Sequence, residues 1–283
     1  MAKRILLECH PNREDVGPAA DTVRAVAAAL GMQVTVSPDP DQPPELVLAL
    51  GGDGTFLAGA RTARHYDIPL LGLNFGHMGF LADTSDDSLE VVVERIRRDA
   101  FEVENRMTLE VEIISPLGAL ARQWALNEAA ILHSDLAHPA DLAFAVDGQV
   151  VSTYGADGII LATPTGSTAY SFSAGGPVVW PDTEAIVMAP LGAHGLFTRP
   201  LVVSPNSVLE VGILPSNRRA PQVWIDGLLA LDAPAGSVVM TTRGARPVRL
   251  ARLENHPFSE RLVNKFNLPV SGWRSPRPHG PNR

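Results

Sequence analysis

The sequence predicts an N-terminal α/β domain, with a parallel sheet and flanking helices, followed by a mainly antiparallel, sandwich-like β domain. Two observations lead to this prediction. Before Arg106, strand-like and helix-like runs alternate, which is typical of a parallel sheet covered by helices. After Arg106 the runs are short and alternate apolar with polar residues, and Pro and Gly interrupt them often.

Each element of the first part is a compact apolar run. The predicted strands cover residues 4–9, 34–36, 46–50 and 68–73, and the predicted helices cover 18–30, a segment ending at 66, and 89–98. In a sheet of this kind, ligands bind outside the carboxyl ends of the strands. The turn that follows Leu50 is therefore a candidate binding site.

Two Asp-Gly pairs organise the second part. Residues 147–148 are expected to join strands 142–146 and 149–154, and residues 226–227 to join 222–225 and 228–231, as hairpins. The predicted domains are 1–105, which carries a glycine-rich turn, and 106–250, which carries a hydroxyl-rich loop. Phe258, Leu262 and Phe266 then predict an amphipathic helix within 251–272 that packs back on the first domain. Residues 273–283, rich in Pro and polar side chains, are expected to be a disordered tail.

Composition excludes several classes of protein. The chain has 283 residues and a net charge of −8, which disfavours binding to nucleic acid or to an anionic membrane. Cys9 is the single cysteine, so no internal disulfide can form and a reducing compartment is expected. No signal peptide and no long apolar stretch is evident, and a cytoplasmic protein is predicted. The eight histidines lack the spacing of a structural metal site.

The turn Gly51-Gly52-Asp53-Gly54 joins an apolar strand to a helix. Its glycines leave backbone N–H groups uncovered, and the positive end of the helix dipole adds to them, so the turn suits phosphate. A carboxylate there is repelled unless it holds a metal or accepts a proton, so Asp53 is a candidate base or magnesium partner. The alternative is that Asp53 only caps the helix. The turn fits neither the Walker A pattern nor Gly-x-Gly-x-x-Gly.

Two further segments are candidates for ligand contact. The loop from Thr163 to Ser173 carries seven hydroxyl side chains and no charge, which suits an uncharged polar cradle. Asn127 and Glu128 form a polar pair inside an otherwise apolar run, so they must find partners or face a ligand.

These segments together resemble the NAD kinases. The resemblance rests on Gly51–Gly54, on Asn127-Glu128, on Asp157-Gly158, on the loop TPTGSTAY at 163–170, and on Gly-Gly-Pro at 175–177, and it extends from about residue 46 to about 273. Phosphofructokinases and the diacylglycerol and sphingosine kinases share only the first turn. The resemblance implies a kinase that transfers a phosphoryl group from ATP, or another donor, to the 2′-hydroxyl of the adenosine ribose of NAD, giving NADP. A diacylglycerol-type lipid kinase and a non-catalytic NAD-binding sensor are the alternatives.

The resemblance also assigns roles to residues. The first domain would bind the phosphate donor, and the second would carry the NAD-binding loop. Gly51, Gly52 and Gly54, in what we call the donor turn, would hold donor phosphates through backbone N–H groups, with Mg²⁺ bound through those phosphates rather than by side chains. Asp53 would accept the proton of the 2′-hydroxyl. The implied NAD-binding residues are Asp53, Gly54, Asn127, Glu128, Asp157, Thr168, Ala169, Tyr170, Ser171, Phe172 and Ser173.

Within that set, Asn127 and Glu128, the acceptor pair, would bind the adenosine end, and residues 168–173 would surround the adenine. Asp157 would reach the nicotinamide end from a neighbouring subunit, which implies a homodimer or homotetramer. Gly155 and Leu228 depart from the family, because many relatives place a basic and a polar residue at these positions.

Overall fold

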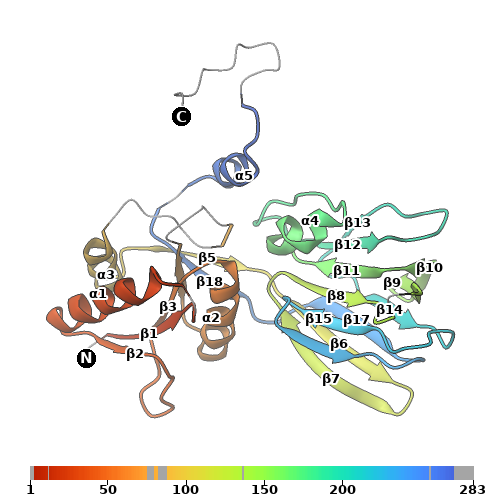
Figure 1. Ribbon diagram of the computed structural model, residues 1–283, viewed down its shortest axis with the longest axis horizontal. Helices are drawn as coiled ribbons and strands as arrows, with labels where there is room; N and C mark the ends of the chain where they lie inside the picture. The colour runs from red at the N-terminus through yellow and green to blue at the C-terminus, as the bar shows by residue number, and fades with distance from the viewer. Residues whose placement is uncertain are drawn as a thin grey trace.

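The computed structural model describes residues 3–11, 13–74, 80–81, 88–135, 137–254 and 256–270. It has two domains side by side, with the last helix above the space between them (Figure 1). The predicted fold class is confirmed.

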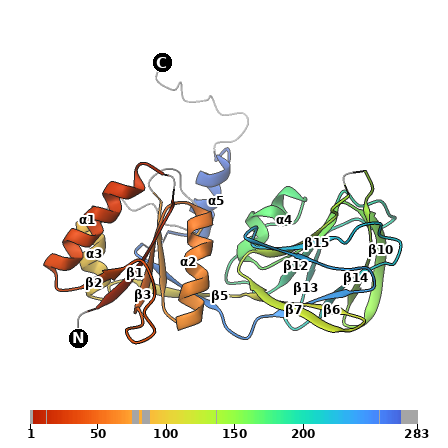
Figure 2. The same cartoon turned by 60° about the horizontal axis from the view of Figure 1, so that its bottom comes forward.

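The first domain is a six-stranded sheet between helices. Its strand order is β2 (Gln33–Thr35), β1 (Arg4–Cys9), β3 (Leu46–Leu50), β4 (Leu70–Leu73), β18 (Val248–Arg252) and β5 (Glu102–Arg106). All pairs are parallel except β18 with β5. Helices α1 (Val16–Ala29) and α3 (Leu89–Arg97) cover one face, and α2 (Asp53–Tyr66) covers the face toward the second domain (Figure 2). Strand β3 is buried along its whole length, as expected for a strand covered on both faces.

The second domain is a sandwich of two antiparallel sheets. One has the order β10 (Gln149–Ala156), β9 (Ala140–Val146), β14 (Leu209–Ile213), β17 (Val238–Arg243), β6 (Leu109–Ser115) and β7 (Gly118–Ala125). The other has the order β13 (Leu201–Val203), β12 (Ile186–Leu191), β11 (Gly158–Ala162), β8 (Glu128–Leu132), β15 (Gln222–Ile225) and β16 (Leu229–Asp232). Both predicted hairpins are present, with Asp147, Gly148, Asp226 and Gly227 at positive φ.

The predicted domain limits differ from the course of the chain at two points. Residues 105 and 250 fall inside β5 and β18, which pair with each other in the first sheet, so the chain crosses between domains just after β5 and just before β18. Local pattern does not reveal this, because β5 is a charged edge strand whose partner lies far along the chain.

The last helix, α5 (Phe258–Phe266), has the predicted extent. It contacts Phe80 of the first domain, as expected, but Phe172 and Trp180 of the second domain as well. The expected tail lies outside the described residues. Within the described part of the chain, no helix has the length and apolar character needed to span a membrane.

Candidate active site

The donor turn lies where β3 ends and α2 begins. Gly52 is the N-cap of α2, with no side-chain capping bond, and Asp53 is the first helical residue, so the alternative that Asp53 only caps the helix is wrong. Gly51 has φ 150°, where a side chain would press on Thr55 and His10. Among the described residues, no atom lies within 4 Å of a Cβ built on Gly52 or Gly54. The turn therefore combines a helix N-terminus with room for a phosphate group.

Asp53 is half-buried at this turn. Burial raises the pKa of its carboxyl group, while the positive charge of Lys265 and a hydrogen bond from the backbone N–H of Leu81 lower it. Among the described residues, no hydrogen-bond partner reaches its buried Oδ1 atom. A buried carboxylate oxygen without a partner is costly, so this atom is available for a proton or a ligand hydroxyl.

Leu81 is itself held in place by Arg252 of β18. The guanidinium of Arg252, 3% exposed, donates to the carbonyl of Leu81 at 2.8 Å and to that of Phe80 at 3.3 Å. Leu81, which donates its N–H to Asp53, is thus held in place by strand β18.

The predicted acceptor pair stands at the start of β8. Asp226, from the hairpin β15–β16, accepts the backbone N–H groups of Leu126, Asn127 and Glu128 at 2.9, 2.7 and 3.1 Å. The residue is 7% exposed. Burial raises the pKa of Asp226, and the three N–H groups oppose that effect. The hairpin turn therefore fixes the backbone of the acceptor pair.

Glu128 shares this corner with Asp226. Burial, and then the neighbouring charge of Asp226, raise the pKa of Glu128 to about 8, against a smaller opposing effect of the Tyr170 N–H. Its Oε2 atom has no hydrogen-bond partner among the described residues. At neutral pH the side chain is thus mostly a neutral carboxylic acid, which can donate as well as accept a hydrogen bond.

Part of the predicted hydroxyl cradle is structural. Thr163 Oγ1 donates to the carbonyl of Leu126 at 2.6 Å and accepts from Gly166 N–H, and Ser167 Oγ bonds the backbone of Pro164 and Val179. Both side chains are fully buried. A Cβ on Gly166 would overlap the backbone of Asn127. These residues press the loop onto the acceptor pair instead of facing a ligand.

The ligand-facing candidates follow in the 3₁₀ turn η1 (Thr165–Thr168) and α4 (Tyr170–Ser173). Thr168, Ala169 and Tyr170 are partly exposed, Phe172 and Ser173 are exposed, and Ser171 is buried with no partner for its hydroxyl in the described chain. Leu126 and Leu81 lie in one apolar cluster with Phe56 of α2, so residues next to the acceptor pair pack with residues of the first domain across the domain boundary.

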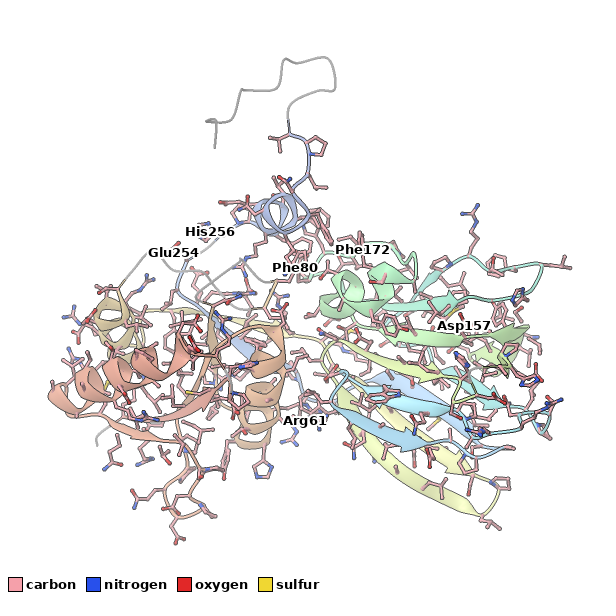
Figure 3. The ribbon with its side chains drawn as sticks, in the orientation of Figure 1. Arg61, Phe80, Asp157, Phe172, Glu254 and His256 are labelled. Atoms are coloured by element: carbon pink, nitrogen blue, oxygen red, sulfur yellow. The ribbon has the colours of Figure 1, made fainter. Side chains whose placement is uncertain are left out.

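Asp157 stands apart from this group. It precedes β11 in the second domain (Figure 3) and is exposed. Its carboxylate lies against Gly192. Its charge still reaches Tyr170, because it contributes to the raised pKa of that phenol after burial. Gly155 has room for a side chain, since a Cβ there would lie 3.7 Å from Asp141 and from Pro139.

The chain matches known proteins along most of its length. The N-terminal domain of ATP-NAD kinases matches residues 9–101, and the C-terminal domain matches residues 126–253. The NAD kinase of Corynebacterium diphtheriae is 48% identical over 263 residues, which cover 92% of this chain and 83% of the relative. The chain belongs to the NAD kinase family.

Solved NAD kinase structures share its architecture. An NAD kinase from Archaeoglobus fulgidus in complex with ATP has a TM-score of 0.70 and 27% identity, covering 94% of this chain and 98% of that one. Yeast NADH kinase complexed with NADH has a TM-score of 0.84 over 97% and 90% of the two chains, and at 22% identity it supports the fold alone.

Three contributing residues were not predicted from the sequence. Asp226 was expected only as a turn residue, and Arg252 and Lys265 were not expected to take part. The signal for Asp226 was weak: its turn is an ordinary Asp-Gly hairpin, and only tertiary structure shows the carboxylate turned onto the acceptor backbone. No group of three or more His, Cys, Asp or Glu side chains forms a metal site within the described residues.

Proposed function

We propose that the chain transfers the γ-phosphoryl group of ATP to the 2′-hydroxyl of the adenosine ribose of NAD. The bond between the γ-phosphorus and the β,γ-bridging oxygen breaks, the bond from O2′ to that phosphorus forms, and ADP leaves. The observation that supports this most directly is the buried Oδ1 atom of Asp53, which has no hydrogen-bond partner among the described residues and lies next to the glycines of the donor turn.

Asp53 acts as the base. An alcohol becomes a good nucleophile only as its proton leaves, and a positioned base contributes roughly 10²- to 10⁴-fold to the rate. Oδ1 of Asp53 accepts the 2′-hydroxyl proton, while the N–H of Leu81 and the charge of Lys265 favour the ionised carboxylate before the reaction.

The glycine turn holds the donor. Gly51, Gly52 and Gly54 leave backbone N–H groups at the start of α2, where the helix dipole favours phosphate oxygens. Among the described residues, nothing lies within 4 Å of a Cβ built on Gly52 or Gly54, which supports a phosphate beside this turn; its Mg²⁺ would be held through phosphate oxygens. Bound Mg²⁺ neutralises phosphate charge; the chain's own contribution is the turn.

The acceptor pair orients NAD. Asn127 and the protonated Glu128 present both donors and acceptors to the adenosine, and residues 168–173 lie beside them with Tyr170 as an aromatic face. Asp157 contacts the nicotinamide end of NAD bound mainly by another subunit, in a homodimer or homotetramer. Its exposure, away from Asp53, is compatible with that placement. We also propose a cytoplasmic location, which the single cysteine supports because it is typical of a reducing compartment.

One assay tests the function. The purified chain is incubated with NAD, ATP and Mg²⁺, and NADP is measured with an NADP-specific dehydrogenase. Formation of NADP at a rate that requires Asp53 supports the proposal. Phosphorylation of diacylglycerol without NADP would favour the lipid kinase, and NAD binding without turnover would favour the sensor.

A further inference from the structure

Helix α5 rests on the segment that bonds the proposed base. The ring of Phe80, next to Leu81, lies 5.8 Å from that of Phe258 and 5.6 Å from that of Phe266. Leu81 donates its N–H to Asp53, and Arg252 fixes the carbonyls of both residues. Helix α5 is therefore connected to the donor turn through Phe80 and Leu81, which Arg252 holds in place.

The same helix also contacts the second domain, at Phe172 of α4 and at Trp180. The Phe266 ring lies 4.5 Å from that of Phe172, and the Phe258 ring lies 5.1 Å from that of Trp180 in an edge-on arrangement. Figure 3 shows Phe80 and Phe172 both beneath α5. Aromatic contacts on two sides give the helix a defined position over the site between the domains.

Lys265 precedes Phe266 on this helix, and its side chain is exposed. Its positive charge acts on Asp53. The chain has 23 basic residues, of which only Lys3 and Lys265 are lysines. Lysine offers a compact ammonium group on a flexible stem, which suits contact with a phosphate as a point charge.

We propose that Lys265 binds the donor phosphates, with α5 holding its ammonium group over the glycine turn by the contacts of Phe258 and Phe266. This inference rests on the proposed function. It adds a side-chain cation to a site in which the other groups that bind phosphate are backbone N–H groups. The ammonium group neutralises charge on the transferred phosphoryl group, and it lies close enough to Asp53 to favour the ionised base.

A structural role predicts different behaviour. Lys265 is in the last turn of α5, where a positive charge is favourable to the helix dipole. In that case its loss would weaken the helix slightly and would affect both substrates alike. A phosphate contact would instead affect ATP selectively.

Lysine labelling provides a readout independent of turnover. An acyl phosphate of ATP, with the acyl group on the γ-phosphate, transfers that group to a nearby lysine amine as ATP leaves. Peptide mapping should find Lys265 labelled much faster than Lys3, which is bonded to Asp99 and to the Ile96 carbonyl of α3. Excess ATP should protect Lys265 and leave Lys3 unaffected. Equal labelling, or no protection by ATP, would overturn the proposal.

Kinetics with matched variants completes the test. Lys265→Gln should lower kcat/KM for ATP by about 10- to 100-fold, the loss expected for a hydrogen bond to a charged group, and leave the KM for NAD within a few-fold. Lys265→Arg keeps the charge and should recover most of the activity. Arg98→Gln, which removes an exposed positive charge at the end of α3, is the control and should behave like wild type.

The outcomes separate the two proposals. Wild-type kcat/KM for ATP in Lys265→Gln, or equal increases in the KM values for ATP and NAD, would contradict the phosphate contact while leaving the NAD kinase function intact. A wild-type protein that forms no NADP would instead contradict the function. Thermal melting of each variant shows whether α5 remains docked.

Discussion

The donor turn presents the half-buried carboxyl group of Asp53, and the acceptor pair presents the buried one of Glu128, in different surroundings. Asp53 and Glu128 each accept one backbone N–H and each has one oxygen without a partner among the described residues. Asp53 lies within reach of a positive charge, whereas Glu128 lies beside Asp226. The two carboxyl groups therefore suit the opposite roles proposed for them, base and hydrogen-bond donor. Burial raises the pKa of both, but a positive charge opposes that effect at Asp53 and a negative charge adds to it at Glu128.

The largest expected effect tests the base. Asp53→Asn should lower kcat by at least about 10²-fold, because the amide cannot accept the 2′-hydroxyl proton. Melting and NAD binding should stay near wild type, since the amide oxygen of Asn can still accept the Leu81 N–H. Turnover within a few-fold of wild type would remove Asp53 from the mechanism.

The next effect tests the packing of the acceptor corner. Gly166→Ala would place a Cβ against the backbone of Asn127, so the loop or β8 must move, at about 1–3 kcal/mol or more of unfolding free energy. Gly17→Ala in α1 is the control, because its Cβ meets open space, and it should be neutral or slightly stabilising. Chemical denaturation of both variants measures the difference; similar stabilities would contradict the close contact.

The raised pKa of Glu128 makes stability depend on pH. The unfolded glutamate ionises near its ordinary pKa of 4.5, while the folded one stays protonated to about 8, so its contribution is complete below pH 4.5 and is lost as pH rises through 8. Glu128→Gln should therefore gain stability relative to wild type as pH increases, on the order of a few kcal/mol. Melting curves at about pH 5, 7 and 9 would show it; a constant difference would contradict the assignment.

Replacing Asn127 and Glu128 together by Ala should weaken NAD binding by about 10- to 100-fold and ATP binding much less, because the lost hydrogen bonds face the acceptor. Calorimetric titration with each ligand measures both constants. Equal losses of affinity for NAD and ATP would indicate damage to the backbone of residues 126–128, which Asp226 holds.

The smallest effect concerns Asp157. In an oligomer with a shared site, Asp157→Ala should raise the KM for NAD by a few-fold, since an exposed charged contact is worth about 1 kcal/mol. Specific activity should also fall as the enzyme is diluted and its subunits separate. A monodisperse monomer with full activity would instead make Asp157 an intrachain turn residue.

Sequence alone determined much of this protein. Residues 46–66 form a buried strand, a glycine turn and a helix start within one continuous segment, so local chemistry was sufficient to locate Asp53. The Asp-Gly hairpins were predictable for the same reason, since the turn conformation depends on the residues at the turn.

Only the tertiary structure decided what surrounds those segments. Asp226 reaches the acceptor backbone across about a hundred residues of chain, β18 returns to a sheet begun near the N-terminus, and α5 brings Lys265 toward Asp53. Neither the burial of a carboxyl group nor the charge beside it is encoded locally. The pKa values of Asp53 and Glu128 therefore depend on contacts between distant parts of the chain.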